Sequence, residues 1–167
     1  WAEAFLPPGI ERVGAWNRAI KIGWHLVETK SALEGAPDEL SLYAGESYWT
    51  GWSSALRRYT LRLDGFVSVN APMSGGEIVT KSLRFHGRTL ALNFATSAAG
   101  GVRVEIQDEW GKPLSGFALE DCPPLFGDAL EGQVTWTKGR DVGAISGQPI
   151  RLRFALQDAD VYAFQFW

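Results

Sequence analysis

The sequence is poor in cysteine, in histidine and in long apolar runs, and each shortage excludes a class of protein. Its single cysteine, Cys122, rules out an internal disulfide. The two histidines, His25 and His86, do not supply a zinc site even with that cysteine, because such a site takes about four nitrogen or sulfur ligands. No apolar run approaches the ~20 residues of a membrane-spanning helix, so we expect no membrane span.

Positive charge is also scarce. Sixteen Lys and Arg residues against nineteen Asp and Glu residues give a net charge of −3, and the pI is near 5.4. A general nucleic-acid binder needs a basic stripe to neutralise phosphates, so we expect no nucleic-acid partner. The glycine pairs at 75–76 and 100–101 precede expected strands, whereas phosphate-binding loops precede helices.

Targeting signals are missing as well. No basic start followed by an apolar run marks a signal peptide. The chain begins at Trp1, so we expect a processed or excised segment of a longer product. The compartment is therefore open, with an extracellular or periplasmic location slightly favoured.

Aromatic residues and alternating patterns are abundant instead. Eight Trp, nine Phe and four Tyr make 13% of the chain. Apolar and polar residues alternate in several short segments, which predicts antiparallel strands with one face on a core. These segments are 59–63, 66–70, 83–85, 90–94, 102–106, 134–136, 150–157 and 162–166. Strands spaced by roughly ten residues favour an all-β fold, a β-sandwich or jelly roll.

Turn residues divide the expected strands. Glu109-Trp110-Gly111 is typical of a hairpin tip, because glycine adopts positive φ at little cost. The run 99–101 is expected to separate two strands, and Asp158-Ala159-Asp160 is expected to be a tight reversal. One helical turn is predicted at 142–146, with Asp141 as its N-cap and Gly147 as its end.

The N-terminal part has a different rhythm. Ile20–Glu28 and Glu39–Ala44 have the pattern of strands joined by a turn at 35–38. Two or three strands are too few to bury their own faces. We therefore expect a segment 1–57 that packs either on the sandwich or on a partner, followed by a sandwich domain at 58–167.

Several motifs resemble a known family. Leu26-Val27-Glu28 followed by Asp38–Tyr43 resembles the last blade of five-bladed β-propeller glycoside hydrolases of the family 32 and 43 type, with Ala44 in place of a second Tyr. The run 57–68 resembles the start of a C-terminal β-sandwich attached to such propellers. The segments 116–122, 151–154 and 158–164 are similar to later signatures of that module.

The resemblance implies a terminal propeller-blade-like segment at 1–57 and an accessory sandwich at 58–167. In such enzymes the catalytic carboxylates lie mainly in earlier blades, so no catalytic residue is expected in this chain. The implied partners are the N-terminal propeller portion, on the same or a separate chain, and a polysaccharide or oligosaccharide. The sandwich would stabilise the propeller and contact sugar, and no cofactor is implied.

Exposed aromatic side chains are the candidate sugar-binding residues. Tyr48, Trp49 and Trp52 share a loop with Gly51, and sugar C–H faces stack on aromatic rings. The alternative is that these rings fill the interface between blade and sandwich. Trp110, at its hairpin tip, is a second candidate. Trp136, which alternates with threonines, is expected in the core.

Acidic residues support a catalytic interpretation less well. A glycosidase needs two carboxylates roughly 5–9.5 Å apart across a sugar, but neighbours on a strand point to opposite faces. Turn hydrogen bonds explain the pair Glu120 and Asp121 adequately, and a structural Ca²⁺ held by Asp121 and Asp128 is an alternative. Besides the accessory glycan-binding role, a subunit with aromatic protein interfaces and a small hydrolase using Glu120 and Asp121 remain open.

Overall fold

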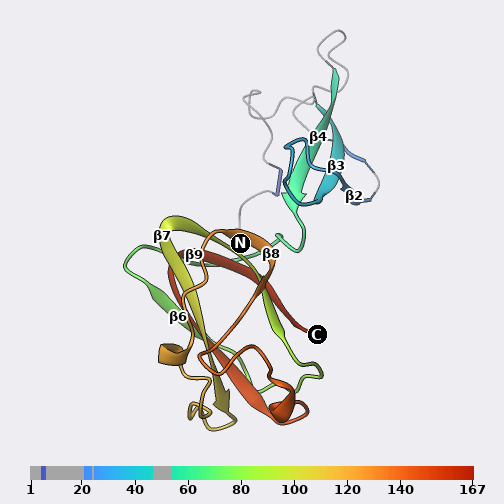
Figure 1. Ribbon diagram of the computed structural model, residues 1–167. Coiled ribbons are helices and arrows are strands. Elements are labelled where there is room, and N and C mark those ends of the chain that lie inside the picture. Colours follow the sequence, from blue (N-terminus) through green and yellow to red (C-terminus); the bar gives the residue numbers. More distant parts are fainter. Residues whose placement is uncertain (1–4, 7–20, 24, 47–53) are drawn as a thin grey trace. The chain divides into compact units, whose positions relative to one another are not determined.

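The computed structural model describes residues 5–6, 21–23, 25–46 and 54–167, and within them nearly all regular structure is strand (Figure 1). The all-β, antiparallel class predicted from the sequence is confirmed. Contacts divide the chain into two units, Trp1–Leu63 and Asp64–Trp167. Among the described residues, no helix has the length and apolar character to cross a membrane.

The N-terminal unit contains a sheet of four strands, β1 (Lys21–Ile22), β2 (Val27–Thr29), β3 (Glu39–Glu46) and β4 (Ala55–Arg62). The short strands β1 and β2 pair with the two ends of β3, and β4 pairs with β3 along its whole length. All of these pairings are antiparallel. The strands expected at 20–28 and 39–44 are therefore present, the first of them interrupted.

Strand β4 corrects one expectation. Its alternation predicted the first strand of the sandwich, but it is paired with β3 from Glu39 opposite Arg62 to Glu46 opposite Ala55. Tyr59 and Leu61 of β4 lie opposite Leu42 and Leu40 of β3, so this part of the period-2 pattern is satisfied within the N-terminal sheet. The alternation was recognised correctly, but its partner was not.

The C-terminal unit is one antiparallel sheet whose central strand is the last in the sequence. Its strands are β5 (Val69–Ala71), β6 (Gly76–Val79), β7 (Leu90–Asp108), β8 (Asp128–Gln133) and β9 (Ile150–Phe166). On one side β9 pairs with β7, and on the other with β5 and β6 in turn. Strand β8 lies beyond β7.

Two predicted chain breaks are wrong, because both lie inside long strands. Strands β7 and β9 pair from Leu90 opposite Phe166 to Asp108 opposite Ile150, with an irregularity between Thr96 and Gly101. The expected strand end at 99–101 and the expected reversal at 158–160 both fall at this irregularity. Extra residues on one strand of a pair bend it without ending it, and glycine marks the close approach of two backbones.

The two halves of β7 and β9 contribute to one apolar core. Trp136 is 3% exposed, as predicted, and its Nε1 donates to the carbonyl oxygen of Val104 at 2.9 Å. The ring of Phe117 lies edge-on to it at 5.2 Å. Cys122 is buried in the same core, and burial raises the pKa of its thiol. A continuous core of this kind is what a self-sufficient domain needs.

Candidate functional site

The first predicted aromatic platform cannot be placed. Tyr48, Trp49 and Trp52 lie outside the described residues, as does Trp24. Their assignment to sugar contact therefore stays a prediction, and so does the alternative that they fill an interface.

The second predicted platform, Trp110, lies within the described residues and is largely exposed to solvent. Its side chain is 83% exposed in the turn that follows β7. One carboxylate oxygen of Asp108 accepts the N–H groups of Trp110 at 3.0 Å and Lys112 at 2.9 Å. Gly111, at φ +91°, donates its N–H to the carbonyl of Asp108 at 3.1 Å. The hairpin tip and the exposure expected from the sequence are both confirmed.

The tip is also tied to the sheet beside it. The backbone N–H of Asp108 donates to the carbonyl oxygen of Lys112 at 2.9 Å, and Gln107 forms an isolated antiparallel β-bridge with Pro113. From β9, the Arg151 Nε donates to the carbonyl oxygen of Glu109 at 3.0 Å. These hydrogen bonds hold the turn that carries the indole in one conformation. A fixed turn reduces the conformational entropy that is lost when the indole binds a partner.

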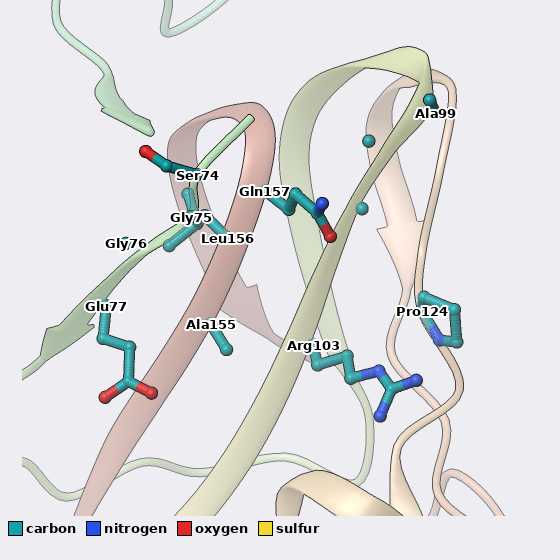
Figure 2. Close-up of a pocket in the computed structure, with 12 residues that line it drawn as sticks. Ser74, Gly75, Gly76, Glu77, Ala99, Arg103, Pro124, Ala155, Leu156 and Gln157 are labelled. Atoms are coloured by element: carbon teal, nitrogen blue, oxygen red, sulfur yellow. The ribbon is translucent and has the colours of Figure 1, made fainter. Parts of the chain in front are cut away.

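A groove on the sheet is a second candidate site, and the sequence did not reveal it (Figure 2). It encloses about 680 Å³, within the range of small-molecule pockets. Most of its lining is small or polar, and the residues are Ser74, Gly75, Gly76, Glu77, Ala99, Gly100, Gly101, Arg103, Pro124, Ala155, Leu156 and Gln157. The glycine pairs at 75–76 and 100–101 were the available signal, and sequence reasoning used them only as strand breaks.

The groove lies where β7 and β9 bend, and backbone contacts fix its walls. A side chain at Gly100 would place its Cβ 2.7 Å from the carbonyl oxygen of Gln157, so only glycine allows the two strands to meet here. The carbonyl of Pro72 accepts the N–H groups of Gly75 at 2.8 Å and Asp158 at 3.0 Å. This pair of bonds joins the turn before β6 to the bent part of β9.

The floor of the groove carries charges on either side of a small residue. Ala155 on β9 lies opposite Glu77 on β6 and opposite Arg103 on β7. Glu77 does not reach across to Arg103, because both of its oxygens bind Arg153, at 2.7 and 3.2 Å. In Figure 2 the guanidinium of Arg103 extends along the groove toward Pro124.

The charge of Arg153 is well compensated. Besides Glu77, it approaches the buried carboxylate of Glu105 at 3.4 Å. Glu105 also accepts the Gln107 side-chain N–H at 2.7 Å and the Leu119 N–H at 3.2 Å. Glu77 in particular raises the pKa of Arg153. By contrast, Arg103 is exposed, and no carboxylate in the described part of the chain lies within ion-pair distance of it.

The acidic residues considered earlier have local roles. Asp121 accepts the Ala118 N–H at 3.3 Å within a 3₁₀ turn, η3 (Leu119–Asp121), and the neighbouring Glu120 is exposed. Asp160 accepts the Ser68 hydroxyl at 2.7 Å. In the expected helical turn, which is the 3₁₀ turn η4 (Gly143–Ile145), Asp141 accepts the N–H of Gly143 at 2.8 Å. Within the described ranges, no three His, Cys, Asp or Glu side chains are grouped to hold a metal ion.

No protein-family model, curated protein or solved structure matches this chain. The resemblance to propeller glycoside hydrolases therefore depends on the sequence motifs alone. The site itself must indicate the function.

Proposed function

We propose that this chain is a non-catalytic accessory portion of a carbohydrate-active protein, and that its C-terminal sandwich binds glycan by stacking a sugar ring on Trp110. The observation that carries the proposal is the 83% exposure of this indole on a turn fixed by Asp108. The exposed ring offers an uncovered apolar surface on which a partner can pack. An indole face suits the C–H face of a sugar and costs little side-chain entropy.

The carboxylates around the groove favour a binding role over hydrolysis. Glu77 and Glu105 are both bound to the same arginine, Arg153. The two catalytic carboxylates of a glycosidase face a bound sugar, whereas these two carboxylates are held by hydrogen bonds to one arginine. Asp121 is occupied in its turn.

The N-terminal unit would be the terminal blade or its remnant. Propeller blades are antiparallel sheets of about four strands, and β2, β3 and β4 form such a meander. In this proposal the accessory portion also stabilises the propeller. A test is to mix the chain with a five-bladed β-propeller glycoside hydrolase of the family 32 or 43 type that lacks its C-terminal module, and to measure a rise in the propeller's melting temperature.

The glycan proposal is tested by comparing Trp110→Ala with the wild type on a panel of polysaccharide affinity gels. An aromatic contact of about 0.5–1.5 kcal/mol predicts roughly 2- to 10-fold weaker retention with an unchanged melting temperature. Trp110→Phe keeps a ring and should retain part of the binding. Trp167→Ala is the matched control, because Trp167 is also exposed, at 57%, but is not on the tip.

Three outcomes would overturn the glycan role. The first is that no polysaccharide retains the wild-type chain, and the second is that Trp110→Ala is retained equally well. The third is that the mass of the wild type rises with protein concentration whereas Trp110→Ala stays monomeric. That result would assign the indole to a protein interface, the alternative function considered from the sequence.

A further inference from the structure

The groove at the bend has the size and rigidity of a ligand site. Its volume of about 680 Å³ suits a monosaccharide or disaccharide better than a protein segment. Its walls are fixed by the two backbone bonds to Pro72 and by the close approach of Gly100 to β9. A site that is formed before binding loses less entropy when a ligand arrives.

The small residues along the floor leave the backbone accessible. Ala155 and Gly101 are the outward-facing positions next to Arg103 on neighbouring parts of β9 and β7. A larger side chain at Ala155 would fill the space between Glu77 and Arg103. Hydrogen-bonding side chains stand at the rim, the Ser74 hydroxyl and the Gln157 amide (Figure 2).

The charge distribution selects the kind of ligand. Glu77 and Glu105 both bind Arg153, and neither lies within ion-pair distance of Arg103. An unpaired guanidinium in a concave site attracts an anion, and its planar fork matches the two oxygens of a carboxylate. A neutral ligand would leave this charge without a partner.

We infer that the groove binds a small ligand bearing a carboxylate, such as a uronic acid, with Arg103 pairing to the carboxylate and the rim residues bonding to hydroxyl groups. This site is separate from Trp110 and does not require the proposed stacking role. If both sites are correct, the preferred glycan is acidic.

The experiment uses the full chain and D-galacturonate as the probe, with amide chemical shifts followed by NMR. We expect saturable shifts at Gly76, Gly101 and Gln157. Neutral D-galactose should bind at least about tenfold more weakly, because it lacks the charged partner of Arg103. Trp110→Ala should bind galacturonate as the wild type does, which separates failure of this site from failure of the stacking role.

Three variants isolate the contributions of charge and space. Arg103→Gln should weaken galacturonate binding about tenfold or more, and Arg103→Lys should restore only part of it because it lacks the fork. Ala155→Leu keeps the charge of Arg103 but fills the groove, so this variant should not bind galacturonate. Arg140→Gln is the matched control, because Arg140 is exposed, donates to the side-chain oxygen of Gln133 at 2.7 Å and does not line the groove.

Each remaining outcome overturns the inference. Absence of saturable shifts with galacturonate would exclude the site. Equal binding of galactose, or of Arg103→Gln, would show that the charge is not used. Equal binding of galactose 6-sulfate would show that the groove accepts any anion and is not selective for carboxylates.

Discussion

The two units are stabilised by different kinds of contact. On one face of the N-terminal sheet, Arg58 donates to the hydroxyls of Ser41 at 2.7 Å and Thr29 at 2.8 Å and pairs with Glu39 at 2.7 Å. Ser41 is fully buried there. The C-terminal unit instead has one contiguous apolar core drawn from both halves of β7 and β9. A polar network fixes register and direction, whereas apolar burial provides most of the free energy of folding.

The largest expected effect comes from separating the units. Residues 64–167 expressed alone should fold cooperatively, because their core lies within their own strands. Residues 1–63 alone should not, because among their described residues only Leu42 and Ala44 are buried apolar side chains, too few for a self-sufficient core. Far-UV circular dichroism during heating measures both. A sharp transition for 1–63 would remove the contrast between the units.

A cavity in the core should have the next largest effect. Leu152→Ala removes a fully buried side chain and should lower the free energy of unfolding by about 2–5 kcal/mol. Leu56→Ala, in the N-terminal unit, changes a side chain that is 76% exposed and should stay within about 0.5 kcal/mol of wild type. Urea denaturation measures both. A small effect of Leu152→Ala would mean that the C-terminal core is less tightly packed than described.

The polar network of the N-terminal sheet should be worth less. Arg58→Met removes the guanidinium that donates to the buried hydroxyl of Ser41. This loss should lower the free energy of unfolding by about 1–3 kcal/mol. Alkylation of Cys122, the single cysteine, reports opening of the C-terminal core in the same samples. The hydroxyl of Thr29 lies 2.7 Å from that of Ser41 and could replace part of the lost bond. A variant as stable as the wild type would show that it does so fully.

The smallest effects are on pH dependence, and the two units should differ in direction. Tyr59 and Arg57 lower the pKa of Glu46 below its ordinary 4.5. The resulting stabilisation is present above that value and is lost as the pH falls through the lowered pKa. The raised pKa of Cys122 acts oppositely, because stability is lost as the pH rises above the thiol's ordinary 9.0. Melting temperatures against pH should flatten on the acid side in Glu46→Gln and on the alkaline side in Cys122→Ala.

Local patterns predicted β3, β4, β7, β9 and the exposed tip. They did not predict β8, and the strand expected at 134–136 is only an isolated bridge at Trp136. Alternation depends on which residues face a core, and a hairpin tip with Gly111 is specified by its own few residues. Partners and bends were misjudged, because glycine and aspartate mark a bulge as readily as a turn. Asp158, at φ +43°, bends β9 without ending it. The groove was missed for the same reason, since its concavity arises only when bent β7 and β9 are paired.

The pairing of β7 with β9 also affects how the chain folds. Residues 109–149 lie between these strands, so the central pair of the C-terminal sheet closes only after a long loop has been brought together. Loop closure of this kind is entropically unfavourable before the contacts form, and folds dominated by distant pairings fold in roughly milliseconds to seconds. On a ribosome, β9 is made after the other strands of its sheet. Those strands therefore have no central partner until β9 emerges, and their apolar faces are exposed to chaperones or to other chains until then.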